Sequence, residues 1–184
     1  KKVRRENENV LLFDAGDMLQ GSPYYNMYKG ELEFKMMTEM GYDGATIGNH
    51  EFDNGLKQLS EQIVHANFPF ISSNYDFTNT PMEGKTIPYK VYEKGGVKVG
   101  VFGLGIELEG LVNKRMYGNT KYLDPVEKSA QMSYLLKKEK TCDLVVCLSH
   151  LGYRYESNKI CDHSLAMRSK NIDLIIGGHT HTNL

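Results

Sequence analysis

Residues 173–181 read Asp-Leu-Ile-Ile-Gly-Gly-His-Thr-His, an apolar run that leads directly into two glycines and two histidines. A short apolar run bounded by glycine is typical of a buried strand. His179 and His181 are two positions apart, so in a regular strand their side chains share one face. Imidazole nitrogens bind transition metals. The stretch therefore predicts a strand that ends in a pair of nitrogen ligands.

Three further stretches repeat this arrangement of an apolar run followed by polar residues. Each offers aspartate, asparagine or histidine, the side chains that hold divalent metals. In open α/β sheets ligands bind at the carboxyl ends of the strands, so four such exits predict one metal site along one sheet edge. The three stretches are Gly16-Asp17 after residues 10–13, Gly48-Asn49-His50-Glu51 after residues 44–47, and Ser149-His150 after residues 144–148.

The remaining sequence alternates between strand-like and helix-like segments. This alternation predicts α/β layers with a largely parallel core. The hairpin signal Lys94-Gly95-Gly96 adds an antiparallel pair, so the sheet is expected to be mixed. The composition of residues 74–85 predicts a long surface loop. Strands are expected at residues 10–13, 44–47, 68–71, 87–92, 97–102, 144–148 and 173–176, and helices at 31–40, 56–66, 125–140 and 160–169.

Composition and charge exclude several classes of protein. A formal net charge of −1 over 184 residues gives no basis for nucleic-acid binding. No run of residues is long and apolar enough to span a membrane. Residues 1–6 are charged, solvated and helix-prone, and no secretory signal is visible, as would also hold for a trimmed mature chain. Cys142, Cys147 and Cys161 form no disulfide framework or zinc motif and are expected to be small apolar core residues.

Taken singly, most of the candidate ligands have a simpler interpretation. Asp17 could be an ordinary strand-end turn residue, and Asn49 could likewise occupy a turn. His150 alone could be structural. His50 could be a surface histidine, a ligand or a group that acts on the substrate. Asp53 lies three residues beyond it, close enough to accept a hydrogen bond from the imidazole and fix its tautomer.

Taken together, these residues resemble the calcineurin-like metallophosphoesterases in both order and context. The strings Asp14-Ala15-Gly16-Asp17-Met18-Leu19-Gln20-Gly21-Ser22-Pro23 and Gly48-Asn49-His50-Glu51-Phe52-Asp53 are similar to those of the 5′-nucleotidase branch in particular. The resemblance covers nearly the whole chain. It implies a four-layer α/β/β/α sandwich with mixed sheets, formed by a catalytic domain over residues 1–184.

The resemblance also implies a role for each residue. Asp17 would bridge two divalent metals, which could be zinc, manganese, iron or cobalt. His50 would stabilise the phosphate or leaving group, with Asp53 orienting it, while the metals activate a water for hydrolysis of a phosphate ester, most simply a nucleoside monophosphate. One metal would be bound by Asn49, His150 and His179, and the other by His181.

One departure from the family pattern leaves an alternative open. The family's first strand carries Asp-x-His, and no such triplet precedes Asp17. We therefore expect the chain to be a fragment that lacks this strand and the C-terminal substrate-binding domain. The alternatives are a 2′,3′-cyclic phosphodiesterase, a nucleotide-sugar hydrolase, or a non-catalytic metal-binding module. Family members are usually exported, which predicts a periplasmic or extracellular location.

Overall fold

The structure is a computed structural model that describes residues 2–183. The longer strands lie in the second half of the chain, whereas the first half supplies short strands and several helices. The strands are β1 (Phe13–Asp14), β2 (Gly44–Ala45), β3 (Tyr75–Asp76), β4 (Tyr89–Lys94), β5 (Val97–Leu104), β6 (Lys121–Tyr122), β7 (Leu144–Ser149) and β8 (Leu174–Gly177). The helices are α1 (Lys2–Glu6), α2 (Pro23–Tyr28), α3 (Glu31–Met40), α4 (Gly55–Gln62), α5 (Lys114–Tyr117), α6 (Pro125–Tyr134) and α7 (Asp162–Arg168).

The strands form one large mixed sheet and two small ones. The large sheet has the order β4-β5-β7-β8, with β4 antiparallel to β5 and the other pairs parallel. This confirms the predicted hairpin and the mixed sheet. In the small sheets, β1 pairs in parallel with β2, and β3 pairs antiparallel with β6. Neighbouring parallel strands end at the same edge of their sheet, and the loops that carry the candidate site residues can follow them there.

Alternation along the strands of the large sheet gives it two buried faces. In β5, Val99 and Val101 belong to one apolar cluster, whereas Phe102 and Leu104 belong to another, as the two-residue period of a strand requires. The second cluster includes Leu165 of α7, so it lies between this sheet and the helices. The first cluster lies between the large sheet and the β1–β2 sheet, since Phe13 of β1 packs against it. Its members are Ile71, Val99, Val101, Val146 and Leu148, with Leu11, Phe13, Ile87, Tyr92 and Ile176 packed against them.

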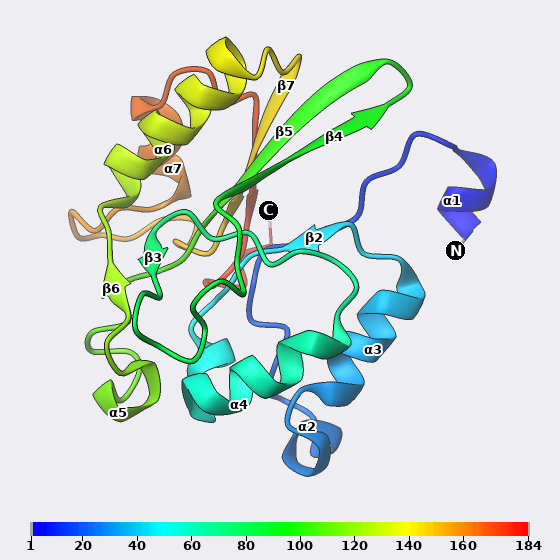
Figure 1. The fold of residues 1–184 in the computed structure, drawn as a ribbon. Coiled ribbons are helices and arrows are strands. Elements are labelled where there is room, and N and C mark those ends of the chain that lie inside the picture. The colour runs from blue at the N-terminus through cyan, green and yellow to red at the C-terminus, as the bar shows by residue number, and fades with distance from the viewer. Residues whose placement is uncertain (1, 184) are drawn as a thin grey trace.

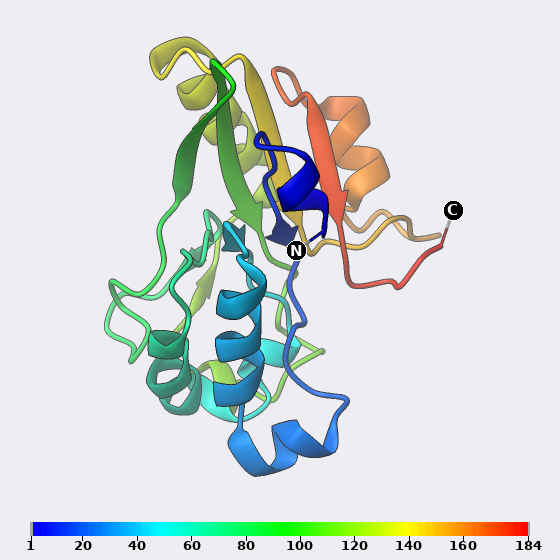
Figure 2. The ribbon, with the colours of Figure 1, turned by 90° about the vertical axis from the view of Figure 1, so that its right-hand side faces the viewer.

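A third apolar cluster lies on the other side of β2. It joins Ala45 and Ile47 to Phe34 of α3 and to Leu56 and Leu59 of α4. Three clusters thus separate four layers in the order helix, sheet, sheet, helix, which confirms the predicted sandwich. Figure 1 shows α6 and α7 together beside the large sheet, and Figure 2 shows β1 and β2 in front of it.

Several predicted elements differ from the observed ones. Residues 68–71 were expected as a strand but form only isolated parallel bridges, Ala45 with Phe70 and Ile71 with Ile87. Pro69 has no N–H group to donate to a ladder, which explains why pairing does not extend. The helix expected at 125–140 begins at Pro125 but changes to a π-helical turn at Leu135–Glu139.

The segment 74–85 is the predicted surface loop only in part, because residues 78–85 form mostly exposed turns whereas the start of the segment is buried. It contains β3, and the side chains of Tyr75, Phe77 and Met82 are buried. Tyr75 and Phe77 pack on Phe52, with ring centroids 5.5 and 6.3 Å from it. Compositional turn signals marked this segment, but its aromatic residues provide enough apolar area to hold it against the core.

Other predictions about the ends and the core are confirmed in part. The opening is helical over Lys2–Glu6, although Arg4 is held by the carbonyl of Gly41 and the carboxylate of Asp43 and is not simply solvated. Lys1 lies outside the described residues. The cysteines are free and buried, as expected. Within residues 2–183, no helix has the length and apolar character needed to cross a bilayer.

Candidate metal centre

The turn after β1 places the carboxylate of Asp17. Gly16 has a φ of +90° and Asp17 itself has a φ of +63°, a left-handed conformation that is uncommon for a residue with a side chain. The N–H of Gly16 donates to Asp14 Oδ1 at 2.9 Å, and the N–H of His50 donates to Asp17 Oδ1 at 2.8 Å. The turn after β1 is thus held against the turn after β2, and Asp17 lies between them.

The turn after β2 begins at Gly48, and there its backbone touches the side chain of Asp17 from the turn after β1. A Cβ atom at Gly48 would lie 2.3 Å from Asp17 Oδ1 and 2.7 Å from His150 Cε1, so only glycine fits. Asn49 follows with 8% of its surface exposed. Its Oδ1 atom is buried and has no hydrogen-bond partner among the described residues. A buried amide oxygen without a partner is costly unless another group meets it.

His150 emerges from β7 and points an imidazole nitrogen at Asp17. Its Nδ1 atom lies 2.6 Å from the carbonyl oxygen of Ala15 and must donate to it, because a carbonyl only accepts. In the neutral ring Nε2 then carries a lone pair, and this atom lies 2.9 Å from Asp17 Oδ2. Two electron-rich atoms at this separation require a cation or a proton. In the chain alone a proton serves: burial lowers the pKa of His150, but the Asp17 carboxylate outweighs it and the pKa is raised.

His179 completes a group of three ligand atoms. One ligand atom each from Asp17, His150 and His179 lie within 4.8 Å of one another. The Nδ1 atom of His179 is buried without a hydrogen-bond partner in the described chain. Burial, followed by the charge of His150, lowers the pKa of His179 and favours the neutral ring. The neutral imidazole is the form that binds metals.

These residues fit a divalent metal. Asp17, Asn49, His150 and His179 offer two oxygen and two nitrogen donors. Within residues 2–183, Asn49 Oδ1 and His179 Nδ1 are buried without a hydrogen-bond partner, and His150 Nε2 faces Asp17 Oδ2. Mixed oxygen and nitrogen donors suit zinc, manganese, iron or cobalt. Asp17, His179 and His181 also have φ values of +63°, +72° and +50°. Backbone strain of this kind clusters at functional sites.

His50 and Asp53 form a pair beside this group. His50 Nδ1 lies 2.8 Å from Asp53 Oδ2, which confirms the hydrogen bond expected from their spacing. The His50 side chain is 37% exposed and that of Asp53 is 29% exposed. His50 begins a short 3-10 helix, His50–Phe52. The hydrogen bond to Asp53 engages Nδ1 of the imidazole and not Nε2.

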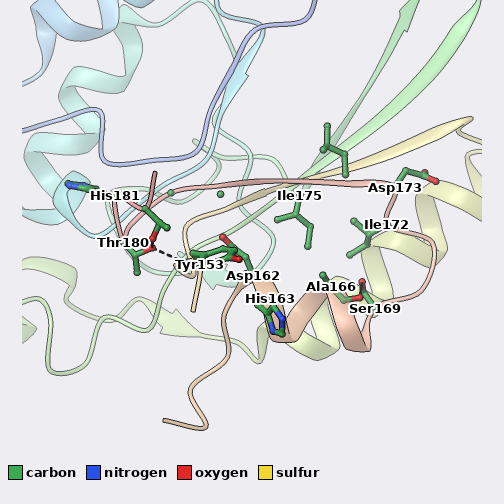
Figure 3. A pocket seen from close by; sticks show the side chains of 14 residues that line it. Tyr153, Asp162, His163, Ala166, Ser169, Ile172, Asp173, Ile175, Thr180 and His181 are labelled. Carbon is green, nitrogen blue, oxygen red and sulfur yellow. Dashed lines mark hydrogen bonds between the residues drawn. The ribbon is translucent and has the colours of Figure 1, made fainter. Parts of the chain in front are cut away.

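His181 is not a member of the three-residue group. It lines a pocket of about 620 Å³ beside β8 and α7, together with Asp162, His163 and Thr180. Figure 3 shows its ring pointing away from Asp162 and His163. The hydroxyl oxygen of Thr180 accepts the N–H of Tyr153 at 3.0 Å. This bond ties the loop after β8, which carries His179 and His181, to the loop after β7. Metal binding by His181 stays a prediction.

Two buried carboxylates at the site were missed by sequence reasoning. Glu51 accepts backbone N–H groups of both turns, and burial, followed by the charge of Asp17, raises its pKa to about 7. The acid directly after Asn49-His50 was a signal that could have identified it. Asp162 accepts the hydroxyl of Ser149, and burial raises its pKa to about 6. Nothing in the spacing of Asp162 pointed to the site.

The model of the calcineurin-like phosphoesterase family matches residues 1–183. The chain belongs to this family. Members of the family use divalent metals, in agreement with the ligand group around Asp17. The family match also agrees with the layered fold derived from the three apolar clusters.

The relatives of this phosphoesterase chain include enzymes named as nucleotidases. A 5′-nucleotidase of Vibrio cholerae serotype O1 is 34% identical over 97% of the chain and 33% of the relative. A snake venom 5′-nucleotidase of Gloydius brevicauda is 35% identical over 100% of the chain and 31% of the relative. The crystal structure of a 5′-nucleotidase precursor from Thermus thermophilus matches 98% of the chain and 34% of its own, with 34% identity and a TM-score of 0.87. The chain spans about a third of the length of the curated relatives it matches.

Proposed function

We propose that this phosphoesterase chain is the metal-binding catalytic domain of a 5′-nucleotidase, which hydrolyses nucleoside monophosphates to nucleoside and phosphate. The observation that carries the proposal is the convergence of Asp17, His150 and His179, whose ligand atoms lie within 4.8 Å of one another. The names of the relatives support the choice of a nucleotide as substrate.

The residues of the chain divide into two ligand sets in this proposal. Asn49, His150 and His179 would hold one metal, His181 would hold a second, and Asp17, which has two carboxylate oxygens, would contribute to both. Two bound metals supply Lewis-acid polarisation of the phosphoryl group and lower the pKa of an attacking water. Asp17 is suited to its role because burial raises its pKa but His150 and the His50 N–H outweigh this, so that the carboxylate stays ionised.

His50 acts on the substrate and Asp53 positions it. The hydrogen bond from His50 Nδ1 to Asp53 Oδ2 holds the ring and leaves Nε2 available to the substrate. From there Nε2 donates a hydrogen bond to the oxygen on which charge develops as the bond to phosphorus breaks.

The rest of the enzyme is inferred from the relatives. Because the chain spans about a third of each, we infer that a further domain supplies the pocket for the nucleoside. We also infer export from the cell, since one relative is named as a precursor and another as a venom enzyme.

The test is metal content and hydrolysis on one sample of the complete encoded polypeptide. The protein is loaded with manganese or zinc and assayed with AMP and with bis-p-nitrophenyl phosphate. About two metals per chain with release of phosphate from AMP is the expected result. Hydrolysis of the diester alone would move the protein to the phosphodiesterase alternative. Fewer than two metals and no turnover would favour a non-catalytic module.

A further inference from the structure

Glu51 sits at the junction of the two turns that carry Asp17 and Asn49. Only 2% of its surface is exposed. Its Oε2 atom accepts the N–H of Gly48 at 2.6 Å and that of Asp17 at 2.9 Å. Its Oε1 atom accepts the N–H of Leu19 at 3.2 Å. One buried carboxylate therefore binds three backbone groups from two segments about 30 residues apart in the sequence.

These bonds bear directly on the geometry of the candidate ligands. The left-handed backbone of Asp17 is strained, so it persists only where surrounding contacts hold it. The bond from its N–H to Glu51 fixes the backbone, and the bond from His50 N–H to Asp17 Oδ1 fixes the side chain. Asn49 follows Gly48, whose N–H is bound by the same Glu51 oxygen.

We propose that Glu51 is a positioning residue of the metal centre, which sets the separation of Asp17 and Asn49 by clamping their two turns together. The inference rests on the proposed function for the identity of the ligands. Glu51 does not belong to the group of ligand atoms from Asp17, His150 and His179. Groups that orient metal ligands typically affect metal affinity about 10- to 100-fold when they are replaced.

The chain offers a matched control at the other end of the same two strands. Asp43 Oδ2 accepts the N–H of Leu12 at 2.7 Å, which clamps the entry of β1 to the entry of β2. Asp43 also binds Arg4. Like Glu51, it is a carboxylate that ties together segments about 30 residues apart. It lies at the opposite end of the strand pair from Asp17, so its loss should affect stability and leave the ligands in place.

The experiment compares Glu51→Gln with Asp43→Asn in the complete polypeptide. Glutamine keeps the shape of glutamate but replaces one acceptor oxygen by an NH₂ group, which faces an N–H donor. We expect both variants to melt at a lower temperature. We expect Glu51→Gln alone to bind Mn²⁺ about 10- to 100-fold more weakly in calorimetry and to change the visible spectrum of bound Co²⁺. Wild-type affinity and an unchanged Co²⁺ spectrum in Glu51→Gln would overturn the proposal.

A measurement on the unaltered protein keeps the test decisive if Glu51→Gln fails to fold. Hydrogen exchange of the Asp17, Leu19 and Gly48 amides should be slow in the metal-free protein, because all three N–H groups are bound by Glu51. Exchange at the rate of an open loop would refute the clamp. If these amides are protected but the wild-type protein binds no metal, the proposed function fails while the clamp itself stands.

Discussion

Replacing Gly48 by alanine places a methyl group where the two turns touch. The new Cβ would lie 2.3 Å from Asp17 Oδ1, more than 1 Å short of ordinary contact, which begins at 3.4 Å. Gly48 has no left-handed φ, so the backbone itself accepts alanine and the clash alone is tested. Overpacking of this kind destabilises a protein by about 1–3 kcal/mol. A ligand displaced by roughly 1 Å reduces a catalytic rate on the order of 100-fold.

The assay measures stability and function on the same samples. Urea unfolding gives the free energy of unfolding, calorimetry gives the metal affinity, and release of phosphate gives the rate. The control is Gly96→Ala at the tip of the β4–β5 hairpin. Gly96 has a φ of +78° with nothing within 4 Å of its Cβ position, so alanine there costs about 1–2 kcal/mol through the backbone alone.

The two variants should therefore lose similar stability but differ in function. Gly48→Ala should bind metal weakly and hydrolyse slowly, while Gly96→Ala should match the wild type in both. The reasoning would be refuted by a Gly48→Ala protein with wild-type metal affinity and rate. Equal losses of function in the two variants would show that general destabilisation, and not the displacement of Asp17, is responsible.

Three other predictions concern single side chains. His50→Asn should lower kcat at unchanged metal content; loss of metal would instead make His50 a ligand. His181→Ala should reduce the metal content by one ion and abolish hydrolysis, and two bound metals with full activity would contradict its assignment. The pKa of Asp162 is about 6 in the folded protein, compared with an ordinary value of 3.8. As pH rises, the Asp162 carboxyl therefore loses its proton at a lower pH in the unfolded chain than in the folded protein. The free energy of unfolding should fall between about pH 4 and 6 by on the order of 3 kcal/mol, and Asp162→Asn should remove this fall in urea unfolding.

The candidate ligands could be predicted because each follows a strand, and strand exits are visible in sequence. The runs before Asp17, His150 and His179 are apolar and end in glycine or serine. The convergence of those exits follows from the parallel arrangement, which the alternation of strands and helices indicated. The contacts that fix the site were not predictable, because Glu51 reaches across 34 residues to the N–H of Asp17. Spacing carries no signal for such long-range bonds.

The fold was predictable at the level of layers but not at every segment. Periodicity located α3, whose end at Gly41 is confirmed by a left-handed cap. The same reasoning failed at residues 68–71, where Pro69 interrupts a ladder, and it was right only in part at 74–85. There the contact of Tyr75 with Phe52 overrides the local preference for a surface loop at the start of the segment.

The four candidate ligands of the first metal come from segments as distant as Asp17 and His179, and this spacing has a thermodynamic consequence. The unfolded chain has no preformed site, so a metal held by these residues binds the folded state alone. At a free concentration 100 times its Kd it would add about 2.7 kcal/mol to the free energy of unfolding. Metal supply would then set how much of the chain is exposed to proteases, so that the abundance of the protein depends on the ion it uses.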